Sequence, residues 1–275
     1  MRSKPVQRRV VSLVLIVVMM LASNATWAWT SALGLEGGSA RLEDPPLNPR
    51  IVFQQNFDNE SSGQIPNGWT VLKASPTVGN FTVDNSTDYV VQGNNSAKFV
   101  DDSTVDSPIA YRNFTQQNGT IIVSFAVSLP NRAGNHTGLE VSVDDGGFNG
   151  ANIIFGDGVV QYFDGSSGLV TLRSSYVANR WYRIKFVMNI RDNIYNIHID
   201  EHLEVAGARF NGSCNQVHRI AITEFSPPNP PGSRLSIGYI DDIEARVGII
   251  IPTDFPTIQQ GTDAASPGDV VYVTR

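Results

Sequence analysis

The stretch Trp181–Ile190, "WYRIKFVMNI", alternates between apolar and polar side chains. One set of alternate positions is apolar (Tyr182, Ile184, Phe186, Met188 and Ile190), and the other holds Arg183, Lys185 and Asn189. Because successive side chains of a β-strand point to opposite faces, this pattern predicts a strand with one face on a core and the other in water.

Similar runs recur between Ile51 and Val247, separated by Gly, Asn, Asp and Pro. They include "GTIIVSFAVSL", "GLEVSVDD", "ANIIFGDG", "VVQYFDG", "NIYNIHID" and "RLSIGYIDDIEARV". No segment between them has a helical period. Many short strands at this spacing predict an all-β fold, an antiparallel sandwich or jelly roll over residues 51–247.

The first 32 residues have the organisation of a secretory signal peptide. Basic residues come first (Arg2, Lys4, Arg8 and Arg9), "VVSLVLIVVMMLA" follows, and Ala28 and Ala32 offer cleavage points. This apolar run is shorter than the about 20 residues that span a bilayer, so we expect cleavage, with an uncleaved anchor as the alternative. Residues 33–50, rich in Gly and Pro, are expected to be a linker. The sequence therefore predicts a secreted or cell-surface protein without a membrane span after cleavage.

Composition excludes one class of partner. The chain has 275 residues and a net charge of −6, and its Lys and Arg residues are dispersed rather than clustered. Binding to nucleic acid requires a basic surface that replaces counterions, so we exclude it. The one cysteine, Cys214, leaves no internal disulfide, and its turn-like surroundings "NGSCNQ" favour an incidental thiol over a nucleophile.

Potential N-glycosylation sites are frequent. The motif Asn-x-Ser/Thr occurs at Asn59, Asn80, Asn85, Asn94, Asn113, Asn118, Asn135 and Asn211. Each requires an exposed position in an exported chain, so the density favours a glycosylated surface protein. Because Asn is common in turns, chance occurrence without glycosylation is the alternative.

Three segments resemble concanavalin A-like, laminin-G-like sandwich domains of secreted microbial proteins. They are "FDNESSGQIPNGW", "NRWYRIKFVMNIRDNIYNIHID" and "IGYIDDIEAR". The resemblance covers Ile51 to Val247 and implies a long strand opened by a Trp-Tyr pair, a hairpin with Asp at its turn, and a closing strand with Asp-Asp-Ile. It also implies a binding or adhesion module for a polysaccharide or surface glycan, without catalysis of its own.

The closing strand raises the question of a bound cation. Strict alternation places Asp241 on the apolar face with Ile243, and Asp242 on the other face. A carboxylate facing a core is costly unless it is paired or bound to a cation. The resemblance implies a structural calcium ion held by Asp241 together with Asp58 and Glu60, since calcium prefers oxygen ligands. The alternative is that Asp241 accepts backbone hydrogen bonds.

Two polar patterns invite an enzymatic interpretation. Glu140, Ser142 and Asp144 in "EVSVD" share one face of a strand, and laminarinase-like glycoside hydrolases carry three acidic residues at this spacing. Ser142 breaks the pattern, so we predict no catalytic site. A second set, His198, Asp200, His202 and Glu204, could bind zinc on a continuous strand, but the resemblance places a hairpin turn there, which we prefer.

Aromatic side chains are candidates for sugar stacking. Tyr162 and Phe163 are adjacent, so one of them faces outward, and we name this pair as the candidate carbohydrate contact. Trp69 and Trp181 are further candidates, although aromatic residues mostly belong to the core of a sandwich.

The C-terminal segment "DFPTIQQGTDAASPGDVVYV" resembles the N-terminal cap of right-handed parallel β-helix proteins, a class that includes pectate lyases. Residues 248–275 are therefore predicted to be a linker, a cap helix that Asp254 can begin, and the first strand of a truncated β-helix. Gly261 departs from the pattern, because Gly costs about 1 kcal/mol relative to Ala within a helix. The alternative is a further strand of the sandwich or a disordered tail.

The predicted function is thus a secreted carbohydrate-binding module. One alternative is an accessory domain of a β-helix polysaccharide lyase or hydrolase, with the chemistry in the β-helix. Another is a structural surface spacer without a ligand.

Overall fold

The computed structural model describes residues 15–16, 51–73, 80–102, 108–130, 138–156, 158–225, 236–251, 256–265 and 270–273. The chain divides into two compact units. One is Ile51–Gly248, and the other combines Met1–Arg50 with Ile249–Arg275.

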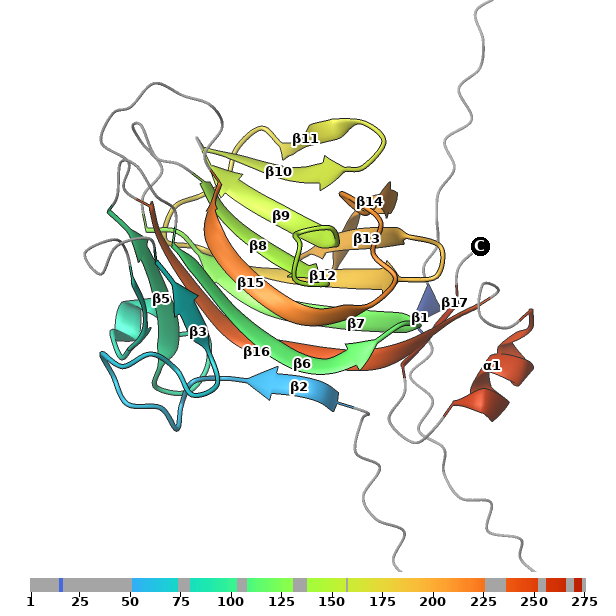
Figure 1. Ribbon diagram of the computed structural model, residues 1–275, viewed down its shortest axis with the longest axis horizontal. Coiled ribbons are helices and arrows are strands. Elements are labelled where there is room, and N and C mark those ends of the chain that lie inside the picture. Colours follow the sequence, from blue (N-terminus) through green and yellow to red (C-terminus); the bar gives the residue numbers. More distant parts are fainter. Residues whose placement is uncertain are drawn as a thin grey trace, which may run out of the picture. The chain divides into compact units, whose positions relative to one another are not determined.

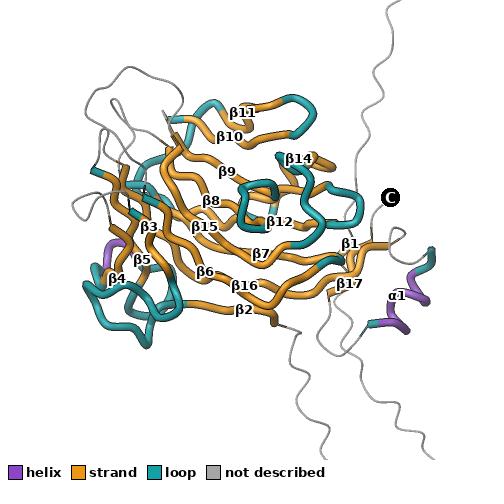
Figure 2. Tube along the Cα trace, viewed as in Figure 1, coloured by secondary structure: helices purple, strands orange, loops and turns teal. Residues whose placement is uncertain are grey.

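The first unit is a sandwich of two antiparallel sheets (Figures 1 and 2). In sheet A the order is β16 (Ser236–Ile251), β7 (Thr120–Ser128), β12 (Trp181–Asn189), β13 (Ile194–Ile199) and β14 (His202–Arg209). Strands β2 (Ile51–Gln55) and β5 (Ser96–Asp101) also pair with β16, and β4 (Asn80–Asp84) pairs with β5. The predicted all-β sandwich is confirmed.

Sheet B has seven strands, among which β6 and β15 bend visibly along their length (Figure 1). Their order is β11 (Gly168–Arg173), β10 (Val159–Asp164), β9 (Ala151–Gly156), β8 (Gly138–Asp144), β15 (Val217–Phe225), β6 (Ile109–Gln117) and β3 (Thr70–Leu72). A short 3-10 helix, η1 (Thr87–Tyr89), lies between β4 and β5 in the chain.

Strand β12 anchors sheet A in the core. Its alternate residues Tyr182, Ile184 and Phe186 are at most 2% exposed. The Phe186 ring meets the ring of Phe125 edge-on at 5.6 Å between centroids, and that of Tyr195 at 5.9 Å. Burial of each such side chain stabilises the fold by roughly 1.5–3 kcal/mol, so this alternating stretch fixes which face of sheet A is inside.

The hairpin after β13 confirms the turn interpretation of "HIDEHLE". Asp200 and Glu201 both have positive φ, 52° and 65°, as a two-residue turn requires, and Ile199 faces His202 across the hairpin. His198 is buried, whereas His202 is exposed and its Nδ1 lies 2.8 Å from the Asp200 carbonyl oxygen. Burial lowers the pKa of His198 to about 4. The turn therefore separates the residues that the zinc alternative required.

A bulge in β16 corrects the predicted orientation of Asp241. In the pairing of β16 with β7, Ile240 lies opposite Val127 and Asp241 opposite Ala126. The next pair is Glu244 opposite Ser124, so β16 has one residue more than β7 at this point. Asp242, at φ 49°, occupies the bulge. Before it the core-facing residue is Ile240, and after it Ile243 and Ala245. Because the extra residue reverses the alternation, Asp241 lies on the face opposite to the sandwich core, and its predicted place beside Ile243 is wrong.

Asp241 is nevertheless fully buried, at 0% exposure, because local structure covers it. The Tyr89 ring stacks on Tyr239 at 4.0 Å between centroids. The Asp241 carboxylate accepts hydrogen bonds from the backbone N–H groups of Val91 (3.1 Å) and Asp242 (2.8 Å).

A second carboxylate holds the other end of the same loop, Val91–Asn95. Asp58 Oδ1 accepts hydrogen bonds from the backbone N–H groups of Asn94 (2.7 Å) and Asn95 (3.2 Å). Gly93 lies against this carboxylate with φ 84°, and a Cβ atom there would fall 2.0 Å from Asp58 Oδ2. The loop thus depends on two carboxylates and on a glycine that lets one of them approach.

The second unit contains helix α1 (Ile258–Ala264) and strands β1 (Leu15–Ile16) and β17 (Val270–Val273), which pair antiparallel. The helix N-cap is Thr257, whose hydroxyl oxygen accepts a hydrogen bond from the Gln260 N–H; Asp254 lies outside the described residues. Gly261 is buried, and a Cβ there would lie 2.4 Å from Ile251 Cδ1, so packing explains this glycine.

In the described part of this unit no coil of a parallel β-helix is present, so the β-helix cap gains no support. Apart from Leu15 and Ile16, the predicted signal peptide and linker lie outside the described residues. Among the described residues, no helix has the length and apolar character needed to cross a membrane.

We predict that Gly93→Ala lowers the free energy of unfolding by roughly 2–4 kcal/mol, because it adds strain at positive φ and displaces the Asp58 carboxylate from charge-assisted hydrogen bonds. Gly63→Ala is the matched control, since Gly63 has φ 79° and no atom within 4 Å of an added Cβ. Urea denaturation of both variants measures the difference. Equal losses in the two variants would show that the contact with Asp58 contributes nothing.

Candidate functional site

The outer face of sheet B, turned away from the core, carries a continuous set of polar side chains. On β8, Leu139, Val141 and Val143 belong to the core, so Glu140, Ser142 and Asp144 point the other way. Their predicted common face is confirmed. All three are buried despite facing outward, at 8%, 1% and 0% exposure.

Register aligns further residues with this set in rows across the sheet. On β15, Arg219 stands between Asn113 of β6 and Asp144 of β8. Ala221 stands between Tyr111 and Ser142, and Asn152 of β9 lies beyond Ser142. We call the following set the polar face: Tyr111, Asn113, Glu140, Ser142, Asp144, Asn152, Phe163, Arg219 and Thr223.

One end of the polar face is an ion pair between β8 and β15. Arg219 Nε donates to Asp144 Oδ1 at 2.8 Å. The same carboxylate accepts hydrogen bonds from the Ser142 hydroxyl (2.7 Å) and the Gly146 N–H (2.7 Å). Since a buried carboxylate is costly unless its oxygens are satisfied, these three donors account for Asp144 at this position.

The Arg219 guanidinium also lies over two aromatic rings. Its Cζ lies 4.7 Å from the ring centroid of Phe148 and 5.6 Å from that of Tyr111. Such contacts stabilise a desolvated cation. Among the described residues, Arg219 Nη2 has no hydrogen-bond partner.

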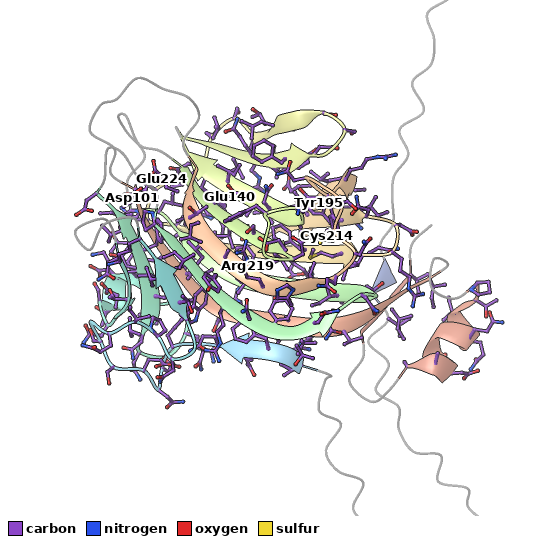
Figure 3. The ribbon with its side chains drawn as sticks, in the orientation of Figure 1. Asp101, Glu140, Tyr195, Cys214, Arg219 and Glu224 are labelled. Atoms are coloured by element: carbon purple, nitrogen blue, oxygen red, sulfur yellow. The ribbon has the colours of Figure 1, made fainter. Side chains whose placement is uncertain are left out.

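Glu140 lies on β8 as well, four residues before Asp144. Figure 3 labels Glu140 together with Arg219, which is on the neighbouring strand β15. Its Oε1 accepts a hydrogen bond from Asn152 Nδ2 at 3.0 Å. Burial raises the pKa of Glu140 to about 7; the Asn152 hydrogen bond opposes this rise, and the charge of Asp144 adds to it. Glu140 is therefore a carboxyl that changes charge near neutral pH.

The candidate sugar-binding pair separates as the alternation requires. Tyr162 is 7% exposed within the core, where its ring lies edge-on to Tyr195. Phe163 is half-buried on the opposite face; its N–H donates to Asn152 Oδ1 (2.8 Å), and its carbonyl accepts from the Tyr195 hydroxyl (2.8 Å). Only Phe163 belongs to the polar face, so a ligand on this surface does not reach the Tyr162 ring.

The remaining aromatic candidates lie elsewhere. Trp69 is 6% exposed and packs on Phe81 in the core. Trp181, which is half-buried, faces Ser128 across sheet A and shares no surface with Phe163. Cys214 is buried, its Sγ donates to the Gln216 carbonyl, and burial raises the pKa of its thiol to about 11, which suits an incidental thiol.

The structure does not gather the three calcium candidates into one group. Asp58 and Asp241 each accept hydrogen bonds from backbone N–H groups. Glu60 accepts hydrogen bonds from Gln55 Nε2 (3.2 Å) and Asn67 Nδ2 (2.6 Å). Within the described residues, no set of three or more acidic, His or Cys side chains could hold a metal. Carboxylates occupied by N–H donors do not fit an ion that needs oxygen ligands around one point. Calcium binding stays a prediction.

Sequence reasoning missed a polar depression beside β2. A pocket of about 210 Å³ is lined by Gln54, Gln55, Asn56, Gln92, Ser124, Arg183, Asp242, Ile243 and Glu244. Arg183 and Asp242 approach to 3.6 Å within it. The run of amides Gln54–Asn56 was the available signal.

Arg219 and Asn152 were missed as well, although Arg219 alternates with the apolar Ile220 and Ile222 of "VHRIAITEF".

No protein-family model and no curated protein matches this chain. Solved structures do match. A sialidase has 16% identity and a TM-score of 0.56 over 73% of this chain, which spans 19% of the sialidase chain. A carbohydrate esterase of the Shiga toxin-encoding bacteriophage phi24B has 12% identity and a TM-score of 0.51, over 72% of this chain and 98% of its own. The cellulose induced protein Cip1 has 13% identity and a TM-score of 0.50, over 70% and 96%.

What they share with this chain is the β-sandwich. At these identities the likeness establishes the fold alone, and the chain spans about a fifth of the sialidase.

We predict that Glu140→Gln flattens the dependence of stability on pH. The pKa of Glu140 is about 7 in the folded chain, against an ordinary value of 4.5 for a glutamate in water, so the folded state binds more protons between these values. The free energy of unfolding therefore falls as pH rises from about 4.5 to about 7, by at most about 1.4 kcal/mol per pH unit.

Gln keeps the shape of Glu140 and an oxygen for Asn152 but does not titrate. The measurement is urea denaturation at pH 4.5, 5.5, 6.5 and 7.5, with Asp88→Asn, at an exposed residue of η1, as the control. An unchanged pH slope in Glu140→Gln would contradict the assignment.

Proposed function

We propose that the chain is an extracellular glycan-binding module and that the polar face of sheet B is its binding surface. One observation carries the proposal: the exposed amide of Asn113 and the half-buried rings of Tyr111 and Phe163 share one face of a sheet. The buried polar groups of Asn152, Glu140 and Arg219 lie on the same face and support it. Such a surface offers directional hydrogen bonds beside an apolar contact, the combination that orients a small polar ligand.

The side chains of this face are fixed before a ligand arrives. Asn152 is held at both ends of its amide, by Glu140 and by the Phe163 N–H. Arg219 is held by Asp144 and two rings. Because little rotamer freedom remains to be lost, binding costs less entropy than on a surface of free side chains.

The contacts of Asp144 favour binding over hydrolysis. Laminarinase-like glycoside hydrolases carry an acidic residue at each position of this pattern, and here Ser142 replaces the middle one. Asp144 is paired with Arg219 Nε and accepts hydrogen bonds from Ser142 and Gly146. It is therefore engaged by these donors and not free to act as nucleophile or general acid.

The comparisons and the sequence support the ligand class and the location. The names of two matched proteins, a sialidase and a carbohydrate esterase, connect this sandwich with carbohydrates. The predicted signal peptide supports export. Every glycosylation candidate in the described part of the chain is exposed; Asn135 lies outside it.

We predict that Phe163→Ala weakens glycan binding at least tenfold, equivalent to about 1.4 kcal/mol, because the aromatic contact of the polar face is lost. Wild type and variant would be compared on an array of cellulose, xylan, β-1,3-glucan, galactan, alginate and polygalacturonate. Isothermal titration would follow with the polysaccharides retained.

Val177→Ala serves as the control, since Val177 is an apolar residue, 56% exposed, outside the polar face. Far-UV circular dichroism and a thermal melt would check the fold of each variant. Absence of binding by the wild type to every polysaccharide, or an equal loss in Val177→Ala, would refute the proposed function.

A further inference from the structure

The polar depression beside β2 lies on sheet A and shares no residue with the polar face of sheet B. Its volume is about 210 Å³, and Ser124 of β7 and Arg183 of β12 are among the residues that line it. A second depression of about 340 Å³ adjoins it, since Gln54, Gln55 and Asn56 line both. Small-molecule sites occupy about 300–1,000 Å³, so the two depressions together offer the space of such a site.

The polar groups of the depression can be reached from solvent. The Arg183 side chain is 57% exposed, and Gln54, Asn56 and Gln92 are exposed as well. Within the described part of the chain, the side-chain amides of Gln54 and Gln92 have no hydrogen-bond partner. An amide both donates and accepts hydrogen bonds, so the depression presents free groups of both kinds to a ligand.

The charged groups of the depression are balanced. Arg183 Nη2 lies 3.6 Å from Asp242 Oδ2, and Glu244 Oε2 accepts a hydrogen bond from Arg246 Nη2 at 2.6 Å. The first separation exceeds the length of a hydrogen bond, so a hydroxyl group can accept from Arg183 and donate to Asp242. An anion would meet two carboxylates and a cation would meet Arg183. An uncharged ligand with several hydroxyl groups therefore fits best.

Local structure fixes both walls of the depression. Asp242 occupies the bulge of β16 at φ 49°, and bulges of this kind redirect a side chain. Gln92 belongs to the loop Val91–Asn95, whose backbone N–H groups are held by the carboxylates of Asp241 and Asp58. Because these walls are already ordered, a ligand that binds between them does not have to order them.

An aromatic side chain lies on the same face of sheet A. Tyr182 and Ile184 of β12 belong to the core, so Trp181 and Arg183 both point to the outer face. Two residues along a strand correspond to about 7 Å, which places Trp181 beside the depression. The Trp181 side chain is half-buried, so part of its ring is accessible to a ligand.

We propose that the outer face of sheet A carries a second carbohydrate site, in which the polar depression binds the hydroxyl groups of an uncharged sugar and Trp181 contacts its ring. A sugar hydroxyl both donates and accepts, as the amides and the Arg183–Asp242 pair require, and the apolar side of the ring suits an indole. This site goes beyond the proposed function, because it lies on the other sheet. A chain with both sites would hold a polysaccharide at two points and gain avidity.

The test isolates sheet A by using Phe163→Ala, which removes the aromatic contact of the polar face. Tetrasaccharides of cellulose, xylan, β-1,3-glucan and galactan would be titrated calorimetrically into the full chain and into this variant. We expect at least one of these uncharged tetrasaccharides to bind Phe163→Ala, with one ligand per chain.

Three further substitutions, each added to Phe163→Ala, assign that binding to the depression. Arg183→Ala, Asp242→Asn and Trp181→Ala should each weaken it at least tenfold; Asn keeps the size of Asp242 and tolerates positive φ. Arg191→Ala is the matched control and should not change it, because Arg191 is an exposed arginine in the turn after β12. A thermal melt would check the fold of each variant.

The outcomes separate the second site from the proposed function. Binding by wild type that is absent in Phe163→Ala overturns the site on sheet A and leaves the proposed function standing. Binding by Phe163→Ala that survives both Arg183→Ala and Asp242→Asn overturns the site as well. Equal binding by wild type and Phe163→Ala that is lost in Arg183→Ala supports the site and overturns the assignment to sheet B. Absence of binding by the wild type to every saccharide overturns both.

Discussion

The structure depends on the packing of two apolar sheet faces against each other. Each strand must give every second side chain to that core, and a shift of one residue would expose the whole apolar set. The register between strands is therefore fixed by the core. Once Ile220 and Ile222 of β15 are inside, Arg219 must stand outside, opposite Asp144 on one side and Asn113 on the other. The outer polar face is a consequence of inner packing.

Local alternation predicted much of the fold, and it failed where a strand is irregular. The sandwich, the hairpin at Asp200–Glu201 and the shared face of Glu140, Ser142 and Asp144 all follow from a period of two. The orientation of Asp241 does not, because the bulge at Asp242 reverses the alternation within β16. No glycine marks this bulge; a non-glycine residue at φ 49° makes it, so the sequence carries no local signal.

The candidate site was harder to predict than the fold, because its contacts join distant segments. Asp144 and Arg219 are separated by 75 residues, and Phe148 covers Arg219 from a loop with an unusual backbone conformation. Phe163 was one of two adjacent aromatic candidates. Which of the two faces outward depends on which face of β10 packs against the core. Period-two reasoning could have marked Arg219 as outward, but not as buried, paired with Asp144 and in contact with two aromatic rings.

One of the glycosylation candidates lies within the candidate site. Asn113 pairs directly with Arg219 across β6 and β15, and its side chain is exposed on the same outer face. An oligosaccharide attached to Asn113 would stand over the guanidinium and act as a covalent competitor for any sugar from solution. The expression host therefore affects any binding measurement. A host that attaches N-glycans would yield protein whose candidate site is covered by its own glycan, and a host that does not would yield protein whose site is uncovered.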